Sequence, residues 1–273
     1  MSTRLRVFEA ARGELRFPMR RLISLLVFLT ATTALAQESP RALVNRSIAH
    51  AGGWAAWSGV HTVQFRKTIV RFAPEGSVTG TVVQIHRYEM DPETRMRIES
   101  EEKGSKVVLI NDGERAWKIV DGKVATTQAD TNSARNSTFG SHYVFGMPFK
   151  LLDPGASLAD AGTKTLDDGT VVRQVRVTYA KGVGDAGGFH TWTYLIEPKT
   201  GRLAANLLLY AAGRYDWTEY LNEKTIGALT LSTLRRGFNA DANGKVGPKQ
   251  SEITYDQIET NVSFSDDLFA PPR

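Results

Sequence analysis

The stretch from His190 to Tyr210, HTWTYLIEPKTGRLAANLLLY, decides the fold. Trp192 and Tyr194 alternate with smaller residues until the pattern breaks at EPKTG, after which an apolar run resumes. Alternation with a period of two residues is typical of a strand with one buried face. Pro198 fixes φ at about −65° and Gly201 can take a positive φ, which suits a tight turn. The stretch therefore predicts a β-hairpin.

The same alternating pattern, interrupted by turn residues, repeats along most of the chain from His61 to Phe264. Asp112-Gly113 and Asp121-Gly122 each separate two short alternating runs, and Asp-Gly is a strong signal for a two-residue hairpin turn. Successive tight turns place neighbouring strands side by side. We therefore predict one large antiparallel sheet with an apolar concave face.

Two segments lack this alternation and are the predicted covers of that face. Residues 40–51 have helical spacing that ends at Gly52-Gly53, and residues 128–155 form a helical or irregular excursion from the sheet. The excursion is expected to pack back on the sheet through its large side chains, which are Phe139, Tyr143, Phe145, Phe149, Leu151 and Leu152.

The predicted concave face carries more bulky apolar side chains than two short covers can fill. An ordinary sheet-on-helix core is one interpretation, and a cavity that holds acyl chains is the other. The second interpretation predicts a ligand-binding face made of strand residues together with two residues of the excursion. These residues are Val63, Phe65, Val83, Ile85, Met96, Ile98, Trp117, Ile119, Trp192, Tyr194, Phe145 and Phe149.

The N-terminus has the layout of a secretory signal. Arg20-Arg21 precede an apolar run, LISLLVFLT, and Ala34-Leu35-Ala36 is a small-residue cleavage site. We therefore expect residues 1–36 to be an N-terminal extension with a cleaved signal peptide, translation to start at Met19, and residues 37–273 to form a single β domain. The apolar run is too short for a transmembrane helix of about 20 residues. A periplasmic protein without a lipid anchor or a transmembrane segment is predicted.

Composition narrows the function classes. Residues 1–36 contain six arginines and two glutamates, so the remainder has 28 basic and 27 acidic side chains. This nearly neutral balance does not favour a nucleic-acid partner, which requires a basic surface. The chain has no cysteine, and its five histidines form no zinc motif. The segment Asn239–Gly244 has some oxygen side chains of a calcium loop, but an Asn-Gly hairpin explains it better. No catalytic residue, metal ligand or cofactor is predicted.

Several short motifs resemble the outer-membrane lipoprotein-sorting (LolA/LolB-like) superfamily. They are Ala49-His50-Ala51-Gly52-Gly53, Asn111-Asp112-Gly113 with Ala116-Trp117-Lys118-Ile119, Leu195–Leu203 and Phe264–Pro272. The resemblance spans most of residues 37–273 and is nearest to uncharacterised branches. It implies an α+β, mainly antiparallel fold, namely an incomplete, half-open β-barrel of about eleven strands wrapped over short helices. It also implies that acyl chains bind in the hollow of the barrel.

These observations predict a periplasmic, non-enzymatic carrier of lipid or of an acylated protein, with a role in outer membrane biogenesis. One alternative is an envelope sensor or protein-interaction module with a membrane-bound partner. Another is an enzyme, and it requires His50, His86, His142 or His190 to lie beside a carboxylate within a pocket.

Overall fold

The computed structural model describes residues 38–90, 94–184, 188–265 and 267–270. The predicted signal peptide and the expected start at Met19 lie outside the described residues. The division between residues 36 and 37 therefore stays a prediction.

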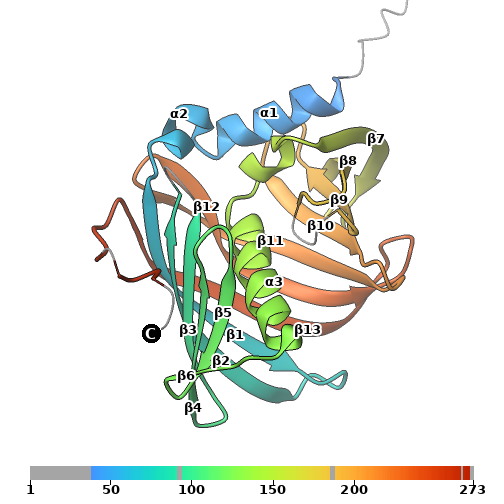
Figure 1. The fold of residues 1–273 in the computed structure, drawn as a ribbon. Helices are drawn as coiled ribbons and strands as arrows, with labels where there is room; N and C mark the ends of the chain where they lie inside the picture. Colours follow the sequence, from blue (N-terminus) through green and yellow to red (C-terminus); the bar gives the residue numbers. More distant parts are fainter. Residues whose placement is uncertain (1–37, 91–93, 185–187, 266, 271–273) are drawn as a thin grey trace, which may run out of the picture. The chain divides into compact units, whose positions relative to one another are not determined.

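The described chain is built on one antiparallel sheet of thirteen strands (Figure 1). The spatial order is β6-β5-β4-β3-β2-β1-β13-β12-β11-β10-β9-β8-β7, so nearly all neighbours in sequence are neighbours in the sheet. The strands are β1 Thr62–Phe72, β2 Val78–Glu89, β3 Arg95–Glu102, β4 Ser105–Asn111, β5 Ala116–Val120, β6 Lys123–Val124, β7 Ala156–Thr165, β8 Val171–Tyr179, β9 Thr191–Ile196, β10 Leu203–Leu209, β11 Tyr215–Ile226, β12 Leu229–Ala240 and β13 Val246–Thr260.

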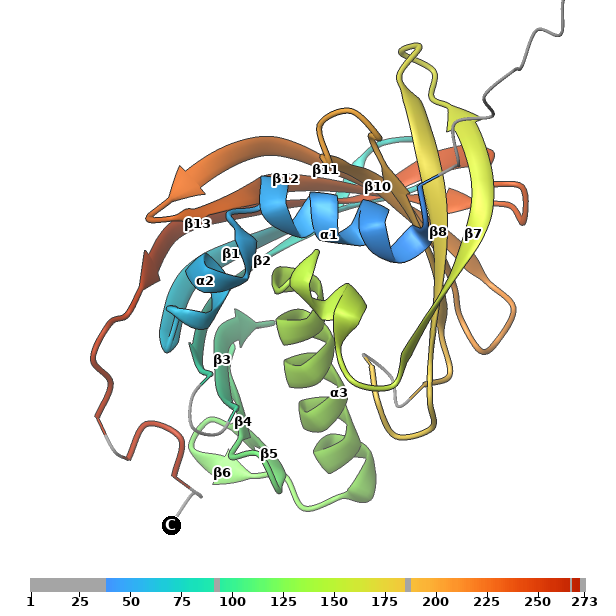
Figure 2. The same ribbon diagram turned by 90° about the horizontal axis from the view of Figure 1, so that it is seen from above.

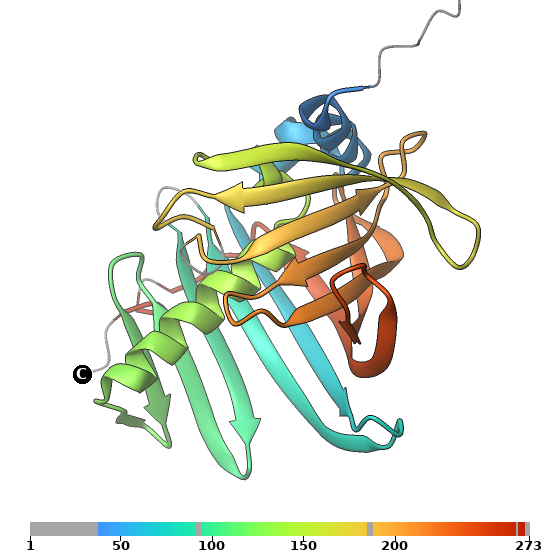
Figure 3. The ribbon, with the colours of Figure 1, turned by 90° about the vertical axis from the view of Figure 1, so that its right-hand side faces the viewer.

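The sheet is open, because β6 and β7 are its two edges and do not pair with each other. The prediction of a half-open, mainly antiparallel barrel is confirmed, with thirteen strands in place of about eleven. The chain must pass from one edge to the other between β6 and β7. It does so through helix α3 (Gln128–Phe145) and the 3₁₀ helix η1 (Phe149–Leu152), which cross the concave side of the sheet (Figures 1 and 3).

The hairpin predicted from His190 to Tyr210 is present as β9 and β10. Leu203 pairs with Ile196 and Leu209 with Thr191 across the two strands. Gly201 has φ 82° in the turn, and a Cβ atom there would lie 2.5 Å from the carbonyl oxygen of Arg46. Glycine is therefore required both by the backbone conformation and by the close approach of the first helix.

Two short helices lie at one end of the sheet, α1 (Pro40–His50) and α2 (Gly53–Ser58) (Figure 2). Ser39 caps α1 by accepting a hydrogen bond from the backbone N–H of Ala42, and Pro40 fits the first turn, where its missing N–H costs nothing. The buried residues of α1 are Leu43, Val44, Ser47 and Ile48, which fall on one face of the helix.

Helix α3 begins at the Thr127 cap, whose side chain accepts from the N–H of Asp130. Its buried residues include Ala134, Thr138, Ser141 and Phe145, spaced three or four apart, so one stripe of the helix faces the sheet. We call α3 and η1 together, residues Gln128–Leu152, the α3 cover. The covering role predicted for residues 128–155 is confirmed.

The sheet is apolar on both faces over part of its area. We call the face under the α3 cover, which carries Val63, Phe65 and Tyr88, the inner face, and the opposite one the outer face. The main core lies between the inner face, α1 and the cover, and a smaller cluster around Leu195 and Trp217 lies on the outer face. Within the described residues, no helix is long and apolar enough to cross a membrane.

Candidate functional site

Eight of the twelve predicted ligand-binding residues are buried between the inner face and its covers. They are Val63, Phe65, Met96, Ile98, Phe145, Phe149, Trp192 and Tyr194. The structure therefore brings most of the predicted set into one region. Their role in ligand binding stays a prediction.

The other four predicted residues lie on the outer face. Residues directly opposite each other in an antiparallel pair share a face, and Val83 is opposite Thr68, whereas inward Phe65 is opposite His86. Ile85 and Val83 therefore point away from the cover. The prediction that β2 turns these two inward is wrong, because His86 and Tyr88 take the inward positions.

The same correction applies to Trp117 and Ile119 of β5. Lys118 between them points to the cover, where its Nζ lies 2.9 Å from Asp130 Oδ1 of α3. Trp117 is instead on the outer face, under the guanidinium of Arg115. A charged pair that fixes the helix has displaced the bulkier aromatic residue from the inward position.

Aromatic rings fill the interior where a large cavity was expected. Phe65 lies between Phe145, at 4.6 Å between ring centroids, and His86, at 4.7 Å, with all three rings close to parallel. Trp57 of α2 stacks on Phe149 of η1 at 4.6 Å. The predicted surplus of apolar face is therefore satisfied by the cover itself in this state.

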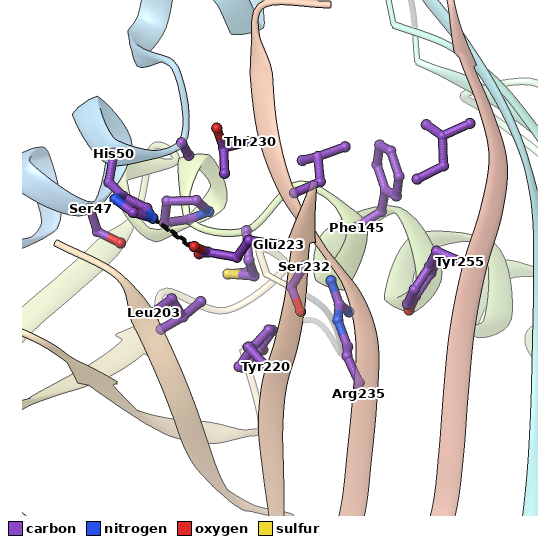
Figure 4. A pocket seen from close by; sticks show the side chains of 15 residues that line it. Ser47, His50, Phe145, Leu203, Tyr220, Glu223, Thr230, Ser232, Arg235 and Tyr255 are labelled. Carbon is purple, nitrogen blue, oxygen red and sulfur yellow. Dashed lines mark hydrogen bonds and ion pairs between the residues drawn. The ribbon is translucent and has the colours of Figure 1, made fainter. Parts of the chain in front are cut away.

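A small, partly open cavity lies between α1, the end of α3 and strands β11 to β13 (Figure 4). Its volume is about 30 Å³, which is room for one or two water molecules and far below the roughly 300–1,000 Å³ of small-molecule sites. Three buried polar atoms on its lining residues have no hydrogen-bond partner in the described part of the chain: Ser47 Oγ, Arg235 Nε and Tyr255 Oη. Ordered water satisfies such atoms in protein interiors.

One histidine does lie beside a carboxylate at this cavity, as the enzyme hypothesis required. His50 Nε2 of α1 is 3.0 Å from both carboxylate oxygens of Glu223 on β11, and Figure 4 shows the two side chains pointing toward each other. Ser47 lies one turn before His50, but its hydroxyl has no hydrogen bond. A triad requires a hydrogen bond between the serine hydroxyl and the histidine, and Ser47 makes none with His50, so the three residues do not form a catalytic triad.

The remaining inward histidines are neutral. His86 accepts at Nδ1 from Tyr88 Oη, 2.7 Å away, and donates from Nε2 to Gln84 Oε1, 3.1 Å away, which is a hydrogen-bond set that neutral imidazole satisfies. Burial, followed by the charge of Lys67, holds the pKa of His86 well below its usual value. Burial lowers the pKa of His142 to about 3. In the described part of the chain, no group of three or more His, Cys, Asp or Glu residues could hold a metal ion.

A groove of about 310 Å³ with both polar and apolar lining residues opens between α3 and strands β1 to β3. Lys67 lines it, and its Nζ is 3.4 Å from Ser141 Oγ of α3. Burial, with the positive charges of Arg235 and Arg71, lowers the pKa of Lys67 to about 8. The lysine therefore stays mostly protonated at neutral pH.

Arg235 of β12 is a second cation on the inner face and is buried. Its Nη2 donates to the carbonyl oxygen of Val144 in α3 at 2.7 Å. Its guanidinium lies over the rings of Tyr220 and Tyr255, at 5.0 and 4.8 Å from their centroids. Aromatic faces partly compensate a buried cation, and the carbonyl bond ties the end of α3 to the sheet.

A larger cavity, of about 610 Å³, lies on the outer face. Its floor includes Trp217 and Ala205, and both signs of charge surround it, including Lys164, Asp168 and Glu219. Lys164 Nζ lies 4.9 Å from the ring centroid of Trp217 and donates to the carbonyl oxygen of Gly244. The β12–β13 hairpin tip thus closes one side of this cavity.

Comparison with solved structures identifies the architecture. A LolA superfamily protein from Nitrosomonas europaea superposes with a TM-score of 0.56 at 11% identity, covering 86% of this chain and 98% of that one. The fold is LolA-like. A DUF1329 family protein from Desulfovibrio piger gives a TM-score of 0.55 at 10% identity, with 85% and 98% covered. A protein domain from Vibrio parahaemolyticus, provisionally described as outer membrane lipoprotein-sorting, gives 0.51 at 9% identity, with 84% and 94% covered.

Sequence comparisons add one family. Residues 103–227 match a family of unknown function, DUF6503. No curated protein matches the sequence. The matched segment runs from the end of β3 to the end of β11, so it contains the whole α3 cover.

Sequence reasoning missed the inner-face cations Lys67 and Arg235 and the partly exposed His50–Glu223 pair of this LolA-like fold. Lys67 stands in phase with Val63 and Phe65 on β1, and Arg235 in phase with Leu231 on β12. A charged residue at an inward position of a strand is unusual, and this was the signal available. The pairing of His50 with Glu223 joins residues 173 positions apart and leaves no local signal.

Proposed function

We propose that the protein is an exported, non-enzymatic carrier that binds the acyl chain of a lipid or an acylated protein on its inner face in the periplasm. The observation that carries the proposal is an open sheet whose apolar inner face is covered by α1 and the α3 cover. The name given to the Vibrio parahaemolyticus domain supports lipoprotein sorting as the biological setting.

The contacts of the α3 cover favour its movement. Its N-terminal half is held by polar contacts that water can replace, such as Asn111 Nδ2 to Thr138 Oγ1 at 3.1 Å and Lys118 to Asp130 at 2.9 Å. The apolar contacts are concentrated near its C-terminal end, around Phe145 and Phe149. Opening is therefore expected to begin in the N-terminal half of the cover, because segments with few buried apolar contacts open at the lowest free-energy cost.

The free energy lost when the cover leaves the inner face is similar to the free energy gained when an acyl chain takes its place. Exposing a large apolar side chain costs about 1.5–3 kcal/mol, so lifting three or four aromatic residues of the cover costs about 10 kcal/mol. An acyl chain of about a dozen methylenes gains a similar amount at ~0.8 kcal/mol each. A chain that replaces the cover can therefore be bound without a preformed cavity.

A reversible lock tests this proposal. The chain has no cysteine, so a double variant, Asn111→Cys with Thr138→Cys, can cross-link α3 to β4 without competing thiols. We expect the reduced protein to bind a fluorescent fatty acid, the oxidised protein to lose binding, and reductant to restore it. The matched control is Thr68→Cys with Val83→Cys, an opposed outer-face pair that leaves the cover free.

Two results contradict the proposal. One is equal binding by the locked and unlocked proteins, which would place the ligand away from the cover. The other is a wild-type protein that carries no lipid in native mass spectrometry after purification from cells and ignores the fatty-acid probe.

The outer cavity supports a second candidate, a protein-interaction module with a membrane-bound partner. At about 610 Å³ and with charges of both signs around Trp217, it fits a peptide segment better than an acyl chain. Partner capture that Trp217→Ala abolishes and the locked cover leaves intact would favour this role. Capture that depends on the unlocked cover would favour the carrier.

A further inference from the structure

The two cations on the inner face lack counterions. Within the described ranges, neither Lys67 nor Arg235 has a carboxylate oxygen within 4.0 Å of its side-chain nitrogens. Arg235 is 6% exposed, and its Nε has no hydrogen-bond partner. A buried charge is normally paired, so the protein holds positive charge here that no other part of the described chain neutralises.

The two cations lie close enough for the charge of Arg235 to act on Lys67, although Lys67 lines the groove and Arg235 lines the small cavity beside it. Tyr255 is directly opposite Lys67 across the β1–β13 pair, and its ring lies 4.8 Å from Arg235 Cζ. Arg235 donates to the carbonyl of Val144, and Val144 also lines the groove that Lys67 enters. The positive charges thus flank the same stretch of α3.

Hydrogen-bond donors line the rest of the groove. Asn136, Ser137 and Ser141 project from α3, and Gln84 projects from β2. Among the described residues, the partner of Lys67 Nζ is Ser141 Oγ at 3.4 Å, a long contact that leaves the ammonium hydrogens available. At Gly140 a Cβ atom would have no neighbour within 4 Å, so the groove has free width beside the lysine.

Apolar side chains continue the groove inward. Ile69, Ile98 and Val144 line it, and Phe145, the next residue of α3, stacks on Phe65 in the core. A polar, cationic mouth therefore adjoins the apolar surface that the cover protects. This is the arrangement that an amphiphile with a charged head requires.

We propose that the groove between α3 and strands β1–β3 binds the anionic head group, a phosphate or a carboxylate, of the amphiphile whose acyl chain takes the inner face. The inference rests on the proposed carrier function and specifies its ligand class. Lys67 is the primary contact, and Arg235 adds positive potential from beneath. The lowered pKa of Lys67 agrees with this geometry, because desolvation and neighbouring cations, which oppose its charge, are what a bound anion offsets.

The test compares two lipids with the same acyl chain, one with an anionic phosphate in its head group and one without a charged group. Lysophosphatidylglycerol, which carries a phosphate, and a monoacylglycerol with the same acyl chain, which carries no charge, are titrated below their micelle concentrations by isothermal calorimetry in phosphate-free buffer. We expect the wild-type protein to prefer the anionic lipid by about tenfold, the effect of one charge-assisted hydrogen bond. Lys67→Met should bring the ratio of the two affinities close to one, and Lys67→Arg should restore it.

A matched control removes the same charge elsewhere. Lys123 is exposed on edge strand β6, and Lys123→Met should keep the wild-type ratio. Equal ratios for Lys67→Met and the wild-type protein would overturn the head-group site, even if both bind lipid well. Circular dichroism and thermal unfolding establish that each variant is folded before titration.

A further arm separates this proposal from the carrier function and identifies the source of the anion. If both lipids bind without preference, the carrier function stands and the head-group site fails. If neither lipid binds but inorganic phosphate does, and Lys67→Met abolishes that binding, the groove is a site for free anions and the lipid assignment fails. Absence of binding by lipids and phosphate overturns both proposals.

Discussion

Phe65 of β1 and Phe145 of α3 stack face to face, with ring centroids 4.6 Å apart and planes 5° from parallel. Both residues were predicted to contact a ligand, and the structure shows them in contact with each other. The stack joins the cover to the centre of the sheet. In the proposed carrier, an acyl chain therefore competes with Phe145 for the surface of Phe65.

Replacement of Phe145 by alanine should both weaken the fold and open the inner face. Loss of a buried phenylalanine costs about 3–5 kcal/mol, so the urea midpoint should fall clearly. Affinity for a fluorescent fatty acid should rise, because less apolar contact must be broken to admit it. Phe145→Leu keeps most of the contact with Phe65. Its urea midpoint and its affinity for the fatty acid should therefore lie between those of Phe145→Ala and of the wild-type protein. Lower stability with reduced affinity would argue that Phe145 is itself part of the binding surface.

The turn glycines give a second prediction, about the attachment of α1. Gly201 and Gly213 have nearly the same φ, 82° and 81°, but a Cβ would lie 2.5 Å from Arg46 O at Gly201 and would meet nothing within 4 Å at Gly213. Gly213→Ala should cost only the left-handed backbone strain, about 1–2 kcal/mol. Gly201→Ala adds a clash with α1, worth about 1–3 kcal/mol more. Chemical denaturation measures the free energy of unfolding of both variants. Equal losses of stability would show that α1 shifts to accommodate the added methyl group at no cost.

Helix α3 contains a glycine that alanine should improve. Gly140 lies within the helix and an added Cβ would meet no atom within 4 Å, so Gly140→Ala should stabilise by about 0.5–1 kcal/mol. Gly146, just after α3, is the control, since its Cβ would lie 2.9 Å from Lys150 Cγ and 3.2 Å from the ring of Trp57. Thermal unfolding should rise for the first variant and fall for the second. A stabilised cover should also bind the fatty-acid probe more weakly if the cover must move.

The hairpins of this fold could be read from the sequence because their signals are local. Asp121 and Gly122 both take positive φ in the β5–β6 turn, which is the conformation that Asp-Gly favours. The excursion was equally visible, since eighteen residues without strand alternation became α3. Strand pairing between neighbours follows once the turns are placed.

The direction of side chains on β2 and β5 could not be read in this way. On β2 apolar Val83 and Ile85 alternate with His86 and Tyr88, and either set could turn inward by composition. The choice depends on His86 stacking on Phe65 and hydrogen-bonding to Tyr88, contacts with a partner strand and with the same strand that hydrophobicity does not describe. The filling of the interior was missed for a related reason, because the volume of the cover residues depends on where α3 crosses the sheet.

The buried histidines predict a loss of stability in mild acid. His142 has a folded pKa of about 3 and His86 has one well below its usual value, whereas both titrate near 6.5 in the unfolded chain. Below pH 6.5 the unfolded state therefore binds more protons, so the free energy of unfolding falls as pH falls, by about 1.4 kcal/mol per pH unit for each histidine. At pH 5 the two together should remove about 4 kcal/mol relative to pH 7. Urea unfolding between pH 7 and pH 5 measures this slope, and His142→Phe should halve it. A slope that His142→Phe does not alter would mean that His142 is charged or solvated in the folded protein, and the packing of α3 against Tyr88 would have to be looser than the edge-on contact at 5.5 Å implies.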